Sequence, residues 1–272
     1  AWNNTGYLAV YNIDGTLLPG WPVYTDGFIL SSPAVGDVNG DGDLEIVVGL
    51  MYSSATFPDE RYGGVYIFDK GGNVLSGWPQ LKGYNFWSSP SLADIDKNGD
   101  LEIGISRLGS KVYLFNHDGA LISGWPQQTA LPCCFWDDYY GNVIGDINGD
   151  RLPDLVTTAG GGVVGSGVHA WNADGVLISG FPKYTEVDAQ APAAIADIDN
   201  DRKIEIAASS DWDTSWDYIL RRAGLKYRGS IYLWDIEANF NGLTMHWSQF
   251  HRDTGRTGLY VRPSIIPREI EF

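Results

Sequence analysis

The chain has 272 residues and a formal net charge of −16, from 18 basic and 34 acidic side chains. That length holds one large domain or two modest ones, and the acidic balance argues against nucleic acid or anionic membrane as a main partner. No apolar run reaches the roughly 18 residues of a membrane span. With 34 glycines and 13 % aromatic residues, the composition favours an all-β protein rich in turns.

Three phrases recur in fixed order along the chain. The first is an alternating strand, the second a hairpin turn closing on an aromatic–Pro pair, and the third an acidic loop running into a β-branched strand. Asp-Gly or Gly-Gly between alternating segments is a strong hairpin signal. The strands end at Asn12, Asp69, Asn116, Asn172 and Asp235, the hairpins close at Pro22, Pro79, Pro126 and Pro182, and the loops begin at Asp37, Asp94, Asp146 and Asp197.

The acidic loops begin 51 to 57 residues apart, and each unit can be divided into four short strands. Helical patterns are missing between these strands, which excludes βαβ units. A four-stranded sheet repeated at this period is the unit of a β-propeller, whose sheets stack around an axis. We therefore expect about five blades over 1–262, with 263–272 as a tail or linker. We expect Trp21, Trp78 and Trp125 to pack between blades.

The sequence does not determine how the ring of blades closes. The chain starts on the third strand of a blade, so the two inner strands of that blade must come from elsewhere. The C-terminal stretches TGLYV and IIPREIEF are candidates, which would close the ring with strands from both termini. In the alternative interpretation, the repeats form part of a larger ring.

The acidic loops have the spacing of a calcium site. Oxygen side chains at positions one, three and five of a tight loop converge on one point, and the carbonyl at position seven and the acid at position nine complete the shell. Ca²⁺ takes six to eight such oxygen ligands. Cys and His are missing from the loops, which disfavours zinc. The predicted ligands are Asp37, Asn39, Asp41, Asp43 and Glu45; Asp94, Asp96, Asn98, Asp100 and Glu102; Asp146, Asn148, Asp150, Leu152 and Asp154; and Asp197, Asp199, Asp201, Lys203 and Glu205.

Solvated acidic turns are the alternative to a metal site, but four loops in register favour about four calcium ions. The acid stands at position nine and a strand follows, so these loops are not EF-hands. Position six often requires a positive φ. In the third and fourth loops this position holds Arg151 and Arg202, so we expect some strain there.

These loops, followed by EIVVG-type strands and preceded by SSP or APA, resemble the FG-GAP/VCBS repeats of integrin α heads and of many secreted proteins. The resemblance covers nearly the whole chain. It implies a propeller fold, calcium at the predicted ligands and a secreted or cell-surface location. Integrin heads have seven blades, whereas this chain shows about five. The family also includes lectins, lyases and adhesins, so the fold does not name the function.

In a four-stranded antiparallel blade, the first and third connections between strands lie on one face and the second and fourth on the other. This strand parity places the acidic loops and the hairpin turns on one face and the irregular insertions on the opposite face. Loops on a rigid scaffold often carry function, so we expect a glycan or protein ligand on the insertion face. Exposed rings beside charged groups suit either ligand; packing inside the protein is the alternative for the rings and a solvated face for the arginines. The predicted ligand-binding residues are Trp136, Asp137, Asp138, Tyr139, Trp212, Trp216, Arg221 and Arg222.

Cys133 and Cys134 are the only cysteines. An even count favours a disulfide if the protein is secreted, and a bridge between neighbours would be strained. Two free buried thiols are the alternative.

The sequence gives little support for catalysis. GGGVVG at 160–165 fits a dinucleotide-binding pattern, but a strand follows where a helix is required. The favoured function is a non-catalytic recognition or adhesion module for glycan or protein. A propeller-type polysaccharide lyase and a structural segment of a larger surface protein or filament are the alternatives; other domains of a longer chain are further candidate partners.

Overall fold

The structure is a computed structural model that describes residues 5–51, 63–81, 84–107, 109–129, 141–160, 166–186, 188–189, 191–210, 229–249, 252 and 258–260. These residues form strands, turns and loops, and they contain no helix. The strands are β1 (Gly6–Leu8), β2 (Val23–Thr25), β3 (Phe28–Ile29), β4 (Ala34–Gly36), β5 (Glu45–Met51), β6 (Gly64–Phe68), β7 (Ser91–Ala93), β8 (Glu102–Arg107), β9 (Lys111–Phe115), β10 (Gln127–Gln128), β11 (Asn142–Gly145), β12 (Asp154–Ala159), β13 (Gly167–Trp171), β14 (Lys183–Tyr184), β15 (Ala194–Ala196), β16 (Lys203–Ser210) and β17 (Ser230–Asn239).

Five antiparallel sheets follow one another along the chain, so the expected all-β class is confirmed. The first sheet holds β1 and β2, the second β3 to β6, the third β7 to β10, the fourth β11 to β14 and the fifth β15 to β17. In the second sheet, β3 and β4 both pair with β5, which also pairs with β6. Four of the five expected third strands are therefore present as β6, β9, β13 and β17, whereas only Leu8 of the strand expected over 8–12 lies in a strand, β1.

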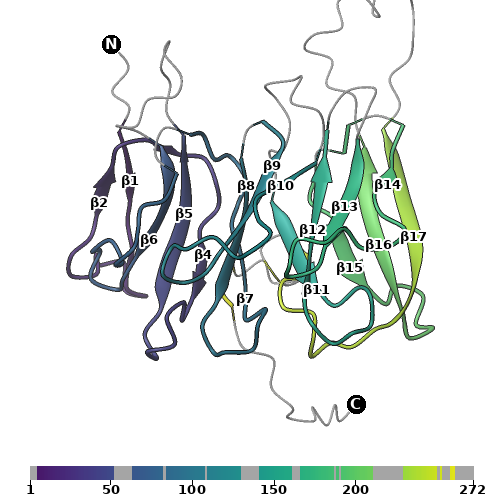
Figure 1. Ribbon diagram of the computed structural model, residues 1–272. Coiled ribbons are helices and arrows are strands. Elements are labelled where there is room, and N and C mark those ends of the chain that lie inside the picture. The colour runs from purple at the N-terminus through teal and green to yellow at the C-terminus, as the bar shows by residue number, and fades with distance from the viewer. Residues whose placement is uncertain are drawn as a thin grey trace, which may run out of the picture.

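The sheets stand side by side, from β1 and β2 at one end to β17 at the other (Figure 1). Their first strands lie in succession, with contacts between β4 and β7, β7 and β11, and β11 and β15. Blades of a propeller are arranged in this way. Closure into a ring stays a prediction.

The hairpin turns that follow the third strands of the first four sheets are held by their own side chains. In the second sheet, Oδ1 of Asp69 accepts hydrogen bonds from the backbone N–H groups of Gly71 at 2.8 Å and Asn73 at 2.9 Å. Gly72 has φ +80°, a conformation that costs glycine little. The Asp-Gly and Gly-Gly signals in the sequence therefore mark true turns.

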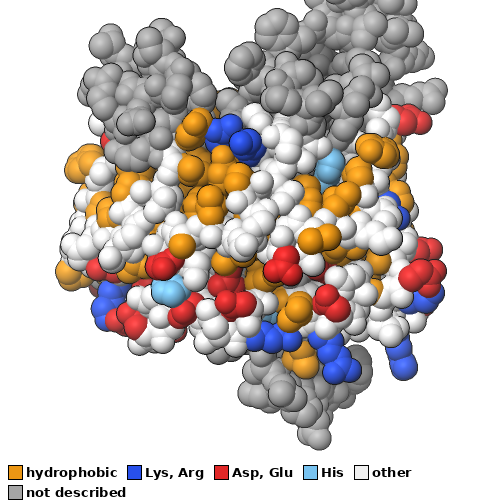
Figure 2. Space-filling model, viewed as in Figure 1, with side chains coloured by type: hydrophobic (Ala, Val, Ile, Leu, Met, Phe, Trp, Pro, Cys, Tyr) orange, Lys and Arg blue, Asp and Glu red, His pale blue; other side chains and the backbone are white. Residues whose placement is uncertain are grey.

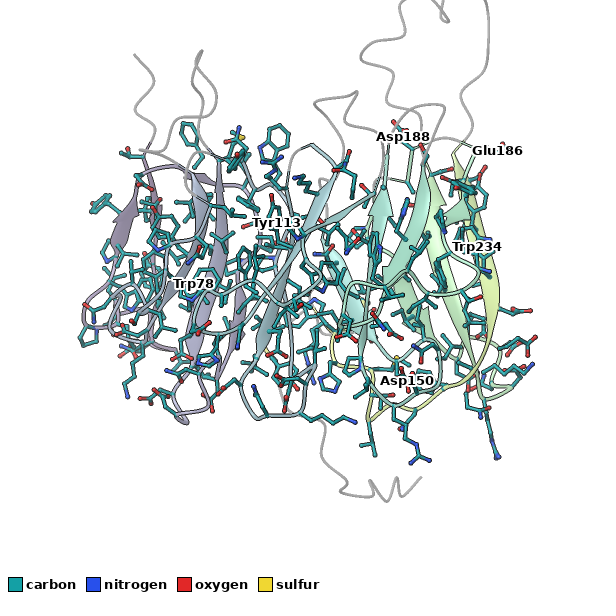
Figure 3. The ribbon with its side chains drawn as sticks, viewed as in Figure 1. Trp78, Tyr113, Asp150, Glu186, Asp188 and Trp234 are labelled. Atoms are coloured by element: carbon teal, nitrogen blue, oxygen red, sulfur yellow. The ribbon has the colours of Figure 1, made fainter. Side chains whose placement is uncertain are left out.

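The tryptophans of the Gly-Trp-Pro turns pack between sheets, as expected. Each of the three is 7 % exposed, and each lies edge-on to an aromatic ring of the next sheet: Trp21 to Phe68, Trp78 to Phe115 and Trp125 to Trp171. Their indole Nε1 groups donate to backbone carbonyls two residues beyond those rings, those of Lys70, His117 and Ala173, at 2.8 to 3.0 Å. Figure 3 shows Trp78 among the side chains of the sheets.

The C-terminal part of the chain crosses the first strands of three sheets. Trp247 exchanges two backbone hydrogen bonds with Ile144 of β11, and the N–H of Ile195 in β15 donates to the carbonyl of Ser248. Leu259 forms a parallel bridge with Val35 of β4. This pairing corrects the expectation that TGLYV completes the first blade, because its described residues pair with the second sheet instead.

The described residues contain no helix that is long and apolar enough to cross a membrane.

Candidate metal centre

The four acidic loops share one set of local hydrogen bonds. The backbone N–H at position five donates to the side-chain oxygen at position three, and the N–H at position seven donates to the side chain at position five. The N–H at position six donates to the first aspartate in every loop. These bonds turn the oxygens at positions one, three and five toward the inside of the loop.

The acid at position nine lies at or near the start of the strand that follows each acidic loop and is buried. Glu45, Glu102, Asp154 and Glu205 are at most 2 % exposed. One carboxylate oxygen of each accepts the backbone N–H of position two, at 2.5 to 3.0 Å. The strand therefore fixes the acid beneath the loop. The hydrogen bond from position two uses only one of the two carboxylate oxygens of this acid.

Three buried carboxylate oxygens in these loops have no hydrogen-bond partner among the described residues. They are Oδ1 of Asp37, Oε1 of Glu102 and Oδ1 of Asp197. A buried polar atom without a partner costs about 1–3 kcal/mol, and more when it carries charge. Each of these oxygens lies in a different loop, and a cation inside each loop would satisfy it, so the residues present fit bound metal ions.

Two loops bring three carboxylates close together. In the second loop, oxygens of Asp94, Asp96 and Glu102 all lie within 4.8 Å of one another, and in the fourth loop those of Asp197, Asp199 and Glu205 do the same. The chain therefore contains acidic clusters that can hold a metal ion. The other predicted ligands share the loop geometry and stay predictions.

Burial of the acid at position nine raises its pKa in the first three loops. Burial raises the pKa of Glu102 to about 8, and the charges of Asp96 and Asp94 add to the rise. Burial likewise raises the pKa of Asp154 to about 8, with Asp150 and Asp146 adding to it. Burial also raises the pKa of Glu45. Without a cation, these groups resist ionisation, and a divalent ion would favour the charged form.

The side chains at position seven point to other partners, which agrees with a role for the carbonyl there. Asp43 pairs with Lys70 at 2.6 Å, and Asp100 pairs with Nδ1 of His117 at 3.1 Å. Lys70 and His117 belong to hairpin turns, so the hairpin turns and the acidic loops lie on the same face, as strand parity predicts. Figure 3 places Asp150 at this end of the molecule and Glu186 and Asp188 at the opposite end. In Figure 2, acidic side chains gather along the lower part of the visible face.

Position six has the expected positive φ, which is +72° at both Arg151 and Arg202 and +93° at Gly42. Position four shares this conformation, a feature that sequence reasoning missed: Lys97 has φ +62° and Asn200 has φ +65°. Only glycine adopts this region without cost. The third and fourth loops therefore carry the expected backbone strain.

The predicted recognition residues lie outside the described part of the chain. This applies to Trp136, Asp137, Asp138, Tyr139, Trp212, Trp216, Arg221 and Arg222, and to Cys133 and Cys134. The residues that flank the longer insertions are described, and Met51, Gly160 and Ser210 end or closely follow second strands. Because the acidic loops precede these strands, the insertions leave the sheets at the end opposite the metal loops.

A groove of about 470 Å³ lies between the fourth sheet and β17, lined in part by Phe181, Lys183, Asp235 and Glu237; it was not predicted from the sequence. Phe181 stands where the other units have tryptophan and lacks an indole N–H. β17 runs on to Asn239, where the other third strands turn back. Two sequence features mark this groove: phenylalanine replaces tryptophan at position 181, and no Asp-Gly follows Asp235.

Comparison with known proteins agrees with this architecture. Residues 30–68 match the family model of the FG-GAP repeat, so the chain contains an FG-GAP repeat that spans β4, the first acidic loop, β5 and β6. Comparison with curated protein sequences gives no match.

Among solved structures, the biofilm matrix protein Bap1 of V. cholerae is similar with a TM-score of 0.52 and 22 % identity, over 85 % of this chain and 31 % of Bap1. A rhamnogalacturonan lyase of Bacillus licheniformis gives a TM-score of 0.43 and 14 % identity, over 96 % of this chain and 55 % of the lyase. The chain thus spans about a third of Bap1. At this identity the likeness to Bap1 concerns the fold alone.

Proposed function

We propose that the chain is a calcium-stabilised β-propeller module of a secreted or cell-surface protein that recognises a glycan or a protein without catalysis. The calcium part rests on the buried carboxylate oxygens of Asp37, Glu102 and Asp197 that have no hydrogen-bond partner within the described ranges. They lie in loops whose predicted metal ligands are all oxygen atoms. Oxygen-rich loops of this kind select Ca²⁺ over softer metals.

The proposed location follows from the same loops. Four ions would bring eight positive charges to a chain of net charge −16. Calcium is abundant outside cells, where loops of about 10⁻⁵ to 10⁻³ M dissociation constant fill. The likeness in fold to a biofilm matrix protein is consistent with an extracellular setting.

The recognition part of the proposal rests on the difference between the loops at the two ends of the sheets. One end holds the four regular acidic loops. The other end carries insertions of different length and composition, rich in aromatic and charged residues. A rigid, ion-braced scaffold that presents variable loops is a common arrangement for binding.

A panel of immobilised glycans and surface proteins, probed with the full chain in calcium buffer, tests this function. We expect a bound ligand whose signal falls at least tenfold in Trp136→Ala or Trp216→Ala. Leu44→Ala is the matched control, because Leu44 is exposed in an acidic loop at the other end, and it should bind normally. Release of unsaturated sugar ends, seen by ultraviolet absorbance, would instead indicate a lyase.

A further inference from the structure

The connection between the second and third strands is short in the third sheet. β8 ends at Arg107 and β9 begins at Lys111, so this connection covers 108–110. In the second, fourth and fifth sheets the same connection covers 52–63, 160–166 and 211–229. Arg107 and Lys111 therefore lie at the end of the sheets opposite the acidic loops (the insertion end), beside the shortest of these four connections.

Arg107 and Lys111 are register partners across this connection, so their side chains lie on the same face of the third sheet. The equivalent partners in the other sheets carry no charge: Leu50 and Gly64, Ala159 and Gly167, and Ser210 and Ser230. Two like charges directly opposite each other destabilise an antiparallel sheet. Three other sheets form here without charges, so the pair points to binding rather than to folding.

The Tyr84 ring packs against the Arg107 guanidinium, with 4.1 Å between Cζ and the ring centroid. Nε of Arg107 is buried and has no hydrogen-bond partner among the residues that the structure describes. The ion pairs in that part of the chain join other residues, so Arg107 and Lys111 have no acidic partner there. A guanidinium that is held on a ring but is not paired loses little freedom when an anion binds.

The charge of this site differs from that of the molecule as a whole. The four acidic loops lie at the opposite end of the sheets, and basic side chains are visible near the insertion end in Figure 2. The chain has a net charge of −16, which repels an extended polyanion. Charges more than about 8–10 Å away are largely screened at physiological salt, so a single anionic group is still attracted by the two cations. The ligand expected here has one negative charge among neutral groups.

We propose that Arg107 and Lys111 bind the carboxylate of one acidic sugar in an otherwise neutral glycan. The two Nη groups of Arg107 match the two oxygens of a carboxylate, and the Lys111 ammonium adds a third donor. Such a glycan fits two cations better than an acidic peptide does, because consecutive acids on a peptide would be repelled by the charge of the whole chain. This inference rests on the proposed recognition function and names its ligand class.

Isothermal titration of the full chain in calcium buffer tests the ligand class. The probes are trisaccharides that end in glucuronic acid or in sialic acid, each compared with its carboxyl-reduced form, which is neutral and otherwise alike. We expect an acidic form to bind about tenfold more tightly than its reduced form, because charge-assisted hydrogen bonds are lost on reduction. High salt should diminish this preference.

Two single variants test the residues. Arg107→Leu matches Leu50 of the second sheet, and Lys111→Gln removes the second charge. Both variants relieve the repulsion between the pair, so each should keep the wild-type melting temperature. Each should bind the acidic trisaccharide about tenfold more weakly than the wild type and the reduced form with unchanged affinity. Arg107→Lys keeps the charge but loses the planar fork and should give an intermediate loss.

Lys70→Gln is the matched control, because it removes a positive charge at the opposite end of the sheets, beside Asp43, and it should bind as the wild type does. Equal binding of acidic and reduced forms, unchanged affinity in Arg107→Leu and Lys111→Gln, or tighter binding of a glutamate-rich peptide would overturn the inference. The inference also fails if neither form of any trisaccharide binds. The recognition proposal itself fails only if the panel of glycans and surface proteins gives no ligand at all.

Discussion

The backbone N–H of Ile95 donates a hydrogen bond of 2.6 Å to Oε2 of Glu102, and the other oxygen of that carboxylate, Oε1, is buried without a hydrogen-bond partner in the part of the chain that the structure describes. The protein holds the carboxylate in place with one oxygen and leaves the second for another group. Asp94 and Asp96 supply further oxygens within 4.8 Å. This arrangement is costly without a cation and favourable with one.

Glu102→Gln should therefore change stability in opposite directions with and without calcium. In calcium buffer we expect the variant to lose the ion of its loop and about 2–3 kcal/mol of unfolding free energy. In EGTA the variant should be as stable as the wild type or more stable, because an amide is neutral at every pH, whereas the Glu102 carboxyl must stay protonated in the calcium-free fold. Urea unfolding in both buffers measures the two differences. Asp43→Asn is the matched control. The Asp43 side chain pairs with Lys70 at the surface, so this variant should change the unfolding free energy by the same amount in calcium and in EGTA.

The calcium-free protein should lose stability as pH rises from about 4.5 to 8. The pKa values of Glu102 and Asp154 in the folded protein are about 8, above the ordinary values of carboxylic acids. The folded chain therefore holds more protons than the unfolded chain in this window, and stability falls with pH. Urea unfolding in EGTA across the window measures the slope. Glu102→Gln should flatten it, and a rise in stability toward pH 8 would contradict the assignment.

Trp78→Phe should destabilise the protein by about 1–2 kcal/mol, because the His117 carbonyl loses the indole N–H that it accepts at 2.8 Å. Phenylalanine keeps the packing against Phe115 in part, so the fold should persist. Thermal unfolding with circular dichroism measures the loss. Trp125→Phe should behave alike, since its indole donates to Ala173 at 2.8 Å. Unchanged stability in both variants would show that these hydrogen bonds contribute little.

Arg151→Gly should stabilise the protein by up to about 1 kcal/mol, because φ at this residue is +72° and glycine adopts that conformation without steric cost. The reverse change at the same loop position, Gly42→Ala, should destabilise by a similar amount. A Cβ on Gly42 has nothing within 4 Å, so only the backbone conformation is tested. If Arg151→Gly destabilises, the arginine side chain contributes more than the strain costs.

The turn geometry of the acidic loops could be predicted because it is local, whereas metal binding by each predicted ligand stays a prediction. Nine consecutive residues determine which oxygens converge, and the buried acid at Glu102 follows from its place at the start of a strand. The packing of Trp78 between sheets could also be predicted, because a large aromatic residue repeated at one position in each unit must meet the next unit.

The remaining features depend on contacts distant in sequence. The bridge between Leu259 and Val35 joins segments from opposite ends of the chain, and no local pattern marks it. The groove beside Phe181 arises because a hairpin present in other sheets is missing from the fifth. The pair of Arg107 and Lys111 stands out only when equivalent register positions of the sheets are compared.

The most direct test of the metal centre is the melting temperature of the full chain in calcium and after treatment with excess EGTA, which removes Ca²⁺ selectively, with the same Mg²⁺ concentration in both samples. Four loops that each contribute about 2.7 kcal/mol at a hundredfold excess of ion over the dissociation constant should lower the melting temperature by at least ~10 °C on chelation. Restored calcium should reverse the change. An identical melting temperature in the two samples would contradict the assignment of these loops as calcium sites.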